Sequence, residues 1–142
     1  MSYKEKKHAK SSWVSPSVVV EKPWGREIRW NALPSINGKI LYLEKGKQNS
    51  FKYNETKNEC LFVLKGEVQV TYGDELSLKD PVNHPTHTRT LNMGDCLNVQ
   101  SNCPYRLTAI TDVEIIEIGD SNRGKIIRLK DDYDRINKRD QL

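Results

Sequence analysis

Short apolar or alternating segments recur along the chain, separated by turn residues roughly every eight to twelve positions, as in all-β domains. Strands are predicted over residues 18–20, 27–30, 39–45, 51–53, 60–65, 67–72, 89–93, 96–99, 105–110, 113–118 and 126–129. Residues 31–38 are predicted to form a loop, and residues 73–88 a hairpin connection with a surface insertion. No amphipathic run is long enough for a core helix. The pattern therefore predicts an all-β sandwich or barrel.

Two strands are too continuously apolar to have a solvated face. Residues 60–64 and 113–118 alternate less than a strand that buries only one side. A second subunit covering the other side would explain this, so we expect a homodimer. Gly66, between residues 60–65 and 67–72, is interpreted as a tight hairpin or a bulge.

Length and hydropathy indicate one domain with polar ends. The chain has 142 residues and a mean hydropathy of −0.74. We divide it into an N-terminal arm (residues 1–17), interpreted as flexible, a β-barrel (18–130) and a charged tail (131–142). No apolar run approaches the roughly 18 residues of a membrane span, and the N-terminus has no apolar signal segment. A cytoplasmic protein without a membrane partner is expected.

The net charge of +4 comes from the ends of the chain. Residues 1–15 hold four Lys and one Glu, and residues 123–142 hold seven Lys or Arg and four Asp, so the segment between them is slightly acidic. Because nucleic-acid grooves need clustered cations with aromatics between them, we expect no nucleic-acid partner. The odd set Cys60, Cys96 and Cys103 lacks metal or disulfide spacing and indicates free thiols.

Two glycine-framed motifs stand in register. The first places Lys52, Asn54 and Glu59 between Gly46 and Gly66, in the spacing G-x5-K-x-N-x4-E-x6-G. The second runs from Gly94 through Gln100 and Asn102 to Tyr105. Both resemble the two motifs of the cupin superfamily, G-x5-H-x-H-x4-E-x6-G and G-x5-P-x-G-x2-H. The resemblance implies a single cupin-type jelly-roll β-barrel, with Asn102 taking the left-handed conformation of the motif glycine.

Two further segments resemble one particular group of cupin domains. Lys22-Pro-Trp-Gly25 resembles the opening of the cupin domain of type II mannose-6-phosphate isomerases, the enzymes often fused to mannose-1-phosphate guanylyltransferase. Ile126-Ile-Arg-Leu-Lys-Asp-Asp-Tyr-Asp-Arg135 is similar to its ending, I-x-R-L-E-D-x-Y-G-R. The resemblance covers about residues 18–135. It implies an origin in sugar-phosphate metabolism.

The histidines that hold a metal in this family are replaced. At the corresponding positions stand Lys52, Asn54, Thr56 and Tyr105, and of the usual ligands the glutamate, Glu59, remains. Divalent metals in such sites need several His and a carboxylate, and an ammonium repels a dication. We therefore predict no bound metal and no cofactor.

The replaced positions still form a candidate polar site. Lys52 and Asn54 share a strand face, and on the inner face they would meet Glu59 and Tyr105. A buried Lys52–Glu59 pair is predicted to replace the metal. Three interpretations stay open: a plugged, inactive site; a metal-free site that binds a small sugar or sugar phosphate; and sugar-phosphate isomerisation with Glu59 as base and Tyr105 or Lys52 as acid. The alternative to all ligand-binding interpretations is a structural or protein-interaction module.

Other candidates have weaker patterns. Lys57 could bind a phosphate at the barrel mouth or be a solvated turn residue. The pair His84 and His87 is interpreted as part of a solvated loop. Trp24 and Trp30 are expected in the core or an interface. Arg106 should point away from Tyr105 and have a structural role.

Overall fold

The computed structural model describes residues 9–120 and 124–133, which form eleven strands and one short helix in two antiparallel sheets. Sheet A has the order β1-β2-β3-β10-β5-β8. Its strands are β1 (Val18–Lys22), β2 (Gly25–Leu33), β3 (Ile36–Leu43), β10 (Val113–Asp120), β5 (Glu59–Lys65) and β8 (Cys96–Val99). Sheet B has the order β11-β4-β9-β6-β7. Its strands are β11 (Ile126–Lys130), β4 (Phe51–Asn54), β9 (Tyr105–Ala109), β6 (Val68–Tyr72) and β7 (His87–Leu91).

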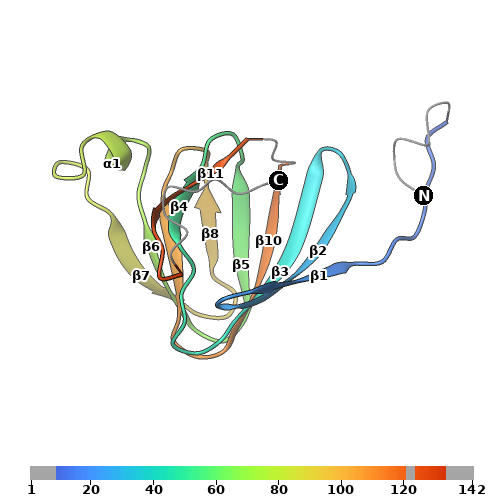
Figure 1. The fold of residues 1–142 in the computed structure, drawn as a ribbon, viewed down its shortest axis with the longest axis horizontal. Helices are drawn as coiled ribbons and strands as arrows, with labels where there is room; N and C mark the ends of the chain where they lie inside the picture. Colours follow the sequence, from blue (N-terminus) through green and yellow to red (C-terminus); the bar gives the residue numbers. More distant parts are fainter. Residues whose placement is uncertain (1–8, 121–123, 134–142) are drawn as a thin grey trace.

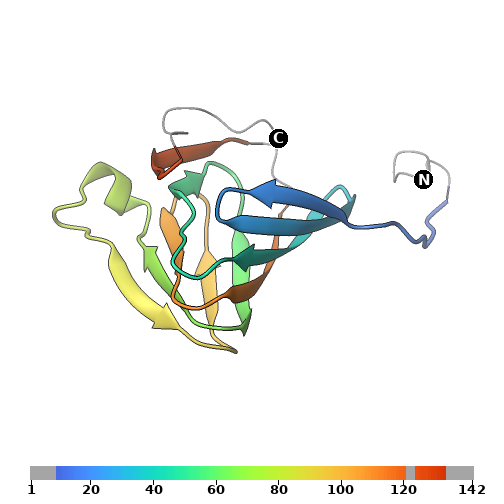
Figure 2. The ribbon, with the colours of Figure 1, turned by 60° about the horizontal axis from the view of Figure 1, so that its bottom comes forward.

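The two sheets face each other and enclose an apolar core (Figures 1 and 2). Strict alternation in β9 and β10 places every second residue inside, as the sequence pattern predicts. Sheet A contributes Leu41, Leu43, Leu61, Val63, Val113 and Ile115, and sheet B contributes Val68, Val70, Leu107 and Ala109. Each such Leu, Ile or Val contributes about 1.5–3 kcal/mol by leaving water. Tight packing of these side chains holds the two sheets at a fixed spacing.

Gly66 is a corner between the sheets, so its interpretation as a hairpin or bulge was wrong. The strands on either side of it, β5 and β6, belong to different sheets. Its φ of 88° lies in the left-handed region, and a Cβ at this position would come within 2.3 Å of the Asp112 carbonyl oxygen. Only glycine fits a corner with both constraints.

The segment predicted as a loop at residues 31–38 is largely strand. β2 continues to Leu33 and β3 starts at Ile36, and these two residues are partners across a turn at Pro34 and Ser35. Gly38 lies under the Trp30 indole, where a Cβ would be 2.0 Å from Nε1. Because this segment is polar and irregular in composition, the sequence pattern does not predict the hairpin. Its register shifts between Trp30 and Leu33.

The remaining elements follow the predicted pattern with small changes at their ends. The connection at residues 73–88 carries the short helix α1 (Leu76–Lys79), visible at the side of the molecule opposite β1 and β2 (Figure 2). The three cysteines are free thiols, as predicted. Within the described residues no helix has the length and apolar character to cross a membrane. Residues 1–8 of the predicted arm and 134–142 of the predicted tail lie outside the described residues.

Candidate functional site

The barrel interior is apolar at one end of the strands and charged at the other. On β5, Glu59 faces inward at the start of the strand and is followed by the inward Leu61 and Val63. On β10, which runs antiparallel to β5, Ile115 precedes the inward Glu117. The charged side chains therefore gather at one level of the barrel.

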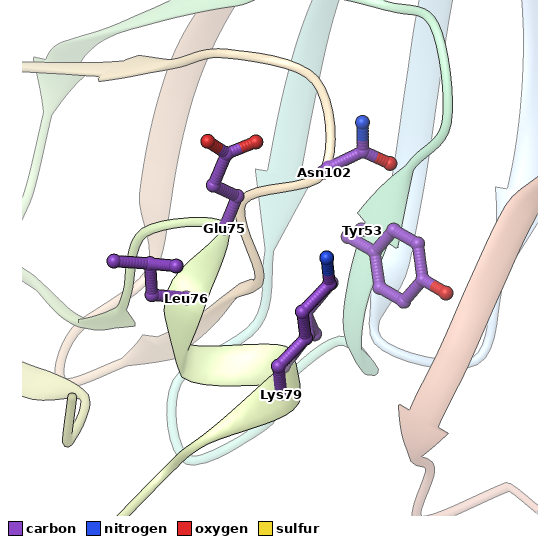
Figure 3. Close-up of a pocket in the computed structure, with 6 residues that line it drawn as sticks. Tyr53, Glu75, Leu76, Lys79 and Asn102 are labelled. Carbon is purple, nitrogen blue, oxygen red and sulfur yellow. The ribbon is translucent and has the colours of Figure 1, made fainter. Parts of the chain in front are cut away.

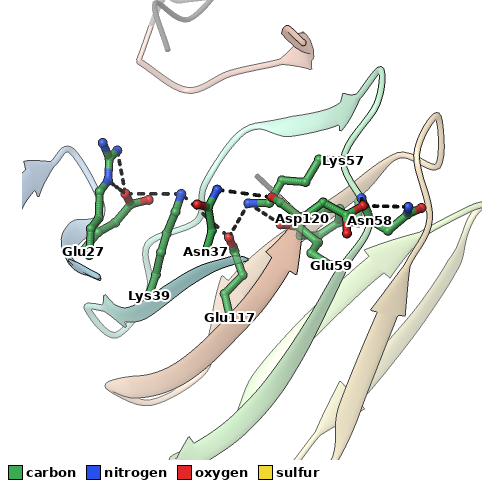
Figure 4. A network of polar contacts seen from close by, with 10 residues as sticks. Glu27, Asn37, Lys39, Lys57, Asn58, Glu59, Glu117 and Asp120 are labelled. Carbon is green, nitrogen blue, oxygen red and sulfur yellow. Dashed lines mark hydrogen bonds and ion pairs between the residues drawn. The ribbon is translucent and has the colours of Figure 1, made fainter. Parts of the chain in front are cut away.

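A chain of alternating ion pairs crosses the inner face of sheet A at this level (Figure 4). It is formed, in order, by Arg29, Glu27, Lys39, Glu117, Lys57 and Glu59. Three cations alternate with three carboxylates, so the chain is neutral as a whole. Glu27, Glu117, Lys57 and Glu59 are each buried. Burial of such charges is tolerated because each one has an oppositely charged neighbour.

Lys57 joins two carboxylates, which contradicts its interpretation as a solvated turn lysine. Its Nζ lies 2.8 Å from Glu117 Oε2 and 3.1 Å from Glu59 Oε2, and the side chain is only 6% exposed. Burial lowers the pKa of Lys57, but the charges of Glu117 and Glu59 outweigh it and raise that pKa well above the ordinary value. Lys57 is therefore a permanently charged structural cation.

Glu59 and Tyr105 meet, as the two motifs predict. The Tyr105 hydroxyl donates a short hydrogen bond to Glu59 Oε1. Burial, the charge of Glu59 and that of Glu117 raise the pKa of Tyr105 well above its usual value, so the phenol stays protonated. Burial and the charge of Glu117 also raise the pKa of Glu59, against the opposing effect of Lys57. The two groups form one donor–acceptor pair on opposite sheets.

Lys52 does not form the predicted ion pair with Glu59, because Lys57 occupies that place. The Lys52 Nζ lies over the Tyr105 ring, 4.9 Å from its centroid. Among the described residues, no carboxylate is within ion-pair distance of it. Burial lowers the pKa of Lys52 to about 8, although Glu59 and Glu117 act to raise it.

The inner row of sheet B carries a second positive group beside Lys52. Arg128 of β11 is the direct partner of Lys52 in the strand register, and Tyr105 is its partner on the other side. Directly opposed residues of antiparallel strands project to the same face. Arg128 is 6% exposed. The row therefore places two cations side by side, facing a neutral chain on sheet A.

Asn54 is buried on the same strand and helps to fix the motif turn. Its carbonyl oxygen accepts a hydrogen bond from the Asn102 N–H. Asn102 has φ 64°, which confirms the left-handed conformation predicted for it. The Asn58 side chain also accepts from the Ser101 N–H and donates to Asp120. These bonds tie the first motif to the second, so that Glu59 and Tyr105 are held together.

The donor set does not fit a metal ion. At the four positions where the motifs call for ligands, the side chains are an ammonium, an amide, a carboxylate and a phenol, from Lys52, Asn54, Glu59 and Tyr105. The Glu59 carboxylate is already shared by Lys57 and Tyr105. In the described part of the chain, no three His, Cys, Asp or Glu side chains are arranged to hold a cation.

Sequence reasoning missed several members of the cluster. The sequence pattern places Lys39, Glu117 and Glu27 in strands and Arg128 in the final motif, and it assigns none of them to the site. The available signal was alternation: in β10 the buried positions Val113, Ile115 and Glu117 follow each other at period two. A charged residue in a buried register indicates a charged partner inside.

Three weaker candidates have structural roles or lie on the surface. His87 is exposed at the start of β7, its ring 5.7 Å from that of Tyr72. Trp24 is in the core, as expected, whereas Trp30 is 43% exposed. Arg106 donates to the Asn49 and Lys130 carbonyl oxygens, which confirms its predicted structural role.

A separate pocket lies between α1 and β4 (Figure 3). Its volume is about 250 Å³, and it is lined by Tyr53, Glu75, Leu76, Leu78, Lys79 and Asn102. Tyr53 alternates with Lys52 and Asn54, so this pocket is outside sheet B and does not open on the ion-pair chain. None of its lining residues is buried. The interior cluster is the stronger candidate site.

Comparison with known proteins identifies the fold and nothing finer. KdgF from Halomonas sp. has 14% identity and a TM-score of 0.62, with 78% of this chain and 96% of that chain covered. A variant of oxalate decarboxylase from Bacillus subtilis has 14% identity and a TM-score of 0.69, covering 88% of this chain but 34% of the enzyme. A vicilin from Solanum melongena, with different anionic ligands in structurally similar pockets, has 16% identity and a TM-score of 0.56, covering 66% of this chain and 26% of the vicilin.

These similarities confirm the predicted class: the chain is a cupin-type jelly-roll β-barrel. No known protein family matches its sequence. No curated protein matches either.

Proposed function

We propose that the barrel binds a small anionic carbohydrate, in the first place a sugar phosphate, without a metal. The observation that carries this proposal is the charge balance at the polar level of the barrel. The chain on sheet A is neutral, whereas Lys52 on sheet B adds a positive charge that no described carboxylate contacts, beside Arg128 in the strand register. A half-buried cation of this kind favours an anionic partner.

Two resemblances support the choice of ligand class. The motifs at residues 22–25 and 126–135 resemble those of mannose-6-phosphate isomerases. The Solanum melongena vicilin, which has a similar fold, has different anionic ligands in structurally similar pockets. A guanidinium and an ammonium on one row suit the phosphate, because both bind phosphate oxygens strongly.

The more specific part of the proposal is that the site isomerises the sugar phosphate that it binds. Aldose–ketose isomerisation moves a proton between neighbouring carbons, which needs one base and one acid in reach of the substrate. Glu59 has a raised pKa and Tyr105 a protonated hydroxyl, so the pair contains both functions. Their mutual hydrogen bond would have to open for substrate. Binding is therefore proposed as the primary function and isomerisation as the second.

Calorimetric titration with mannose 6-phosphate and fructose 6-phosphate tests the proposal. Wild-type protein should bind in the presence of a chelator, and Lys52→Gln should weaken binding at least about tenfold, the loss expected for one charged hydrogen bond. Lys65→Gln, an exposed lysine at the end of β5, is the matched control and should bind normally. Equal binding by Lys52→Gln and wild type, or binding only with added metal, would contradict the proposal.

A second candidate function, an interaction module, is favoured by the outer face of sheet A. Four large apolar side chains there are between 37% and 55% exposed: Trp30, Phe62, Leu64 and Ile118. Opposite charges are register partners on this face, since Glu114 is opposite Lys65 and Glu21 is opposite Arg26. A second copy of the chain would meet no excess of like charge there. The occupant we propose is therefore a second copy, giving a homodimer.

Light scattering during size-exclusion chromatography tests the dimer. The wild type should elute as a dimer, and Phe62→Lys with Ile118→Lys should give a monomer, because each lysine would be desolvated in the interface. Val82→Lys, in an exposed loop, should stay dimeric. A monomeric wild type would overturn the proposed homodimer without affecting sugar-phosphate binding.

A further inference from the structure

The amine of Lys52 has an environment unlike that of the other lysines of the cluster. It projects from the inner face of β4 over the Tyr105 ring, and its side chain is partly accessible to solvent. No described carboxylate pairs with it, whereas Lys57 contacts two carboxylates and Lys39 lies 3.6 Å and 3.7 Å from two. Lys52 is thus the lysine in this cluster that can give up its proton without leaving a carboxylate unpaired.

An amine in this state is a nucleophile near neutral pH. Burial lowers the pKa of Lys52 to about 8, so a substantial fraction is unprotonated at pH 7–8. An ordinary lysine, with a pKa near 10.4, has almost no free amine there. Desolvated lysines of this kind attack carbonyl groups to form imines.

The neighbouring Tyr105–Glu59 pair supplies the proton transfers that imine formation needs. The Tyr105 ring that lies under the Lys52 amine carries the hydroxyl bonded to Glu59. When a carbinolamine loses water, a proton must reach the leaving oxygen and another must leave the nitrogen. A protonated phenol and a carboxylate in one hydrogen bond can exchange these protons without a net change in their charge.

We propose that Lys52 captures the carbonyl group of an open-chain aldose or ketose phosphate as an imine. The Lys52 nitrogen forms a bond to the carbonyl carbon while the π electron pair moves to oxygen, and a proton passes from nitrogen to oxygen to give the carbinolamine. The C–O bond then breaks, water leaves, and the C=N bond forms. The step consumes one carbonyl compound and releases one water, with no oxidant or reductant. This inference rests on the proposed sugar-phosphate site and adds a covalent bond to it.

The charged surroundings of the amine favour an anionic carbonyl compound over a neutral one. Tyr105 and Arg128 flank Lys52 on the neighbouring strands, and the charges of Glu59, Glu117, Lys39 and Glu27 act on it from the opposite sheet. Of these, the carboxylates are joined to cations in the ion-pair chain. Arg128, next to Lys52 in register, is placed for the phosphate end of the same molecule.

Reductive trapping tests the imine. The full-length protein is incubated with mannose 6-phosphate and sodium cyanoborohydride, and the modified residue is located by peptide mass spectrometry. Lys52 should gain the mass of the sugar phosphate less one oxygen atom, at least about tenfold faster than the exposed Lys45 and Lys65, as the difference in free amine predicts. The reaction should accelerate between pH 7 and 8.5 and then level off, whereas Lys45 and Lys65 should keep accelerating.

Competition gives a readout that does not depend on a variant folding. The alditol phosphate made by reducing mannose 6-phosphate has no carbonyl but keeps the charge, and it should protect Lys52 while leaving Lys65 unprotected. Modification at Lys52 no faster than at Lys65 would overturn the imine proposal. If calorimetry still shows both phosphates binding in a Lys52-dependent way, the proposed function stands and only the covalent step fails. If neither binds, both fail.

Discussion

Lys57 and Lys52 lie in the same barrel interior, five residues apart in the chain, and their environments have opposite effects. Lys57 comes from the turn after β4 and sits between Glu59 and Glu117, which raise its pKa above the ordinary value. Lys52 comes from β4 itself and lies on an aromatic ring, where burial lowers its pKa to about 8. Burial acts on both in the same direction. The difference comes from whether a carboxylate is in contact.

Within one polar cluster, Lys57 therefore has a structural role, whereas Lys52 is the lysine that can react. The ion-pair chain that includes Lys57 is fully matched and joins strands β2, β3, β10 and β5 across the inside of sheet A (Figure 4). The row that includes Lys52 belongs to sheet B, and no carboxylate of the described residues is in contact with the Lys52 amine. The ion-pair chain links the strands of sheet A at this level, and Lys52 is the group that can gain a charged partner from a ligand.

Replacing each of the two lysines with a neutral residue should show the largest difference in the free energy of unfolding. Lys57→Met leaves Glu59 and Glu117 facing each other without a cation, and should cost about 3–5 kcal/mol of unfolding free energy, as when one member of a buried ion pair is removed. Lys52→Met removes a desolvated charge that has no carboxylate in contact, and should change stability by less than about 1 kcal/mol or increase it. Denaturant unfolding at pH 7 measures both. Equal losses in the two variants would refute the distinction.

The pH dependence of the free energy of unfolding should include a contribution from the lowered pKa of Lys52. Well below pH 8 both folded and unfolded states hold the proton on Lys52, so the desolvation penalty is present in full. Between pH 8 and 10.5 the folded state releases that proton while the unfolded state keeps it, so stability rises with pH, by at most about 3 kcal/mol. Above pH 10 the raised pKa values of Tyr105 and Lys57 act in the opposite direction.

Subtracting the profile of Lys52→Met isolates this contribution. Burial raises the pKa of the Cys60 and Cys103 thiols, which reduces stability as pH rises through 9 and partly masks the effect of Lys52 in the raw curve. The difference between wild type and variant should rise with pH over the window 8–10.5. A flat or falling difference would mean that the folded pKa of Lys52 is not lowered.

Removing the Tyr105 hydroxyl should destabilise the protein less than removing the Lys57 ammonium. Tyr105→Phe deletes one hydrogen bond to Glu59 but leaves Lys57 in place, so it should cost about 1–2 kcal/mol. It keeps the ring under Lys52, so the lowered pKa of Lys52 should persist. Tyr72→Phe, on the neighbouring strand, is the matched control and should be close to wild type. A loss as large as that of Lys57→Met would show that Tyr105, not Lys57, is what compensates Glu59.

The sequence predicts the barrel well because its signals are local. Alternation locates strands, and the glycine-framed motifs place Glu59 opposite Tyr105, which the structure brings into contact. The direction of a long side chain in a turn has no such periodicity. The sequence therefore does not distinguish Lys57 from a solvated lysine, and it predicts for Lys52 the partner, Glu59, that Lys57 has in the structure. The site roles of Lys52, Asn54, Glu59, Tyr105 and Lys57 stay predictions.

The sequence pattern also does not predict corners between the sheets or the pairing of strands that are far apart in the chain. Gly66 separates two strands that look like a hairpin, yet β5 pairs with β8 and β10 while β6 pairs with β7 and β9. The partners of Glu117 and Lys39 likewise come from strands that are far apart in the chain. Such contacts follow from the jelly-roll topology, and a residue's own neighbours do not encode them.

The most direct measurement is an NMR titration of the lysine side chains, following the 13Cε and 15Nζ shifts of Lys52 and Lys57 assigned through Lys52→Arg and Lys57→Arg. The account predicts that Lys52 titrates near pH 8 and that Lys57 stays protonated beyond the ordinary lysine value. Addition of mannose 6-phosphate should move the Lys52 signal and raise its midpoint, with little change at Lys57. Two lysines that both titrate near pH 10.5, or a ligand response confined to Lys57, would contradict the account.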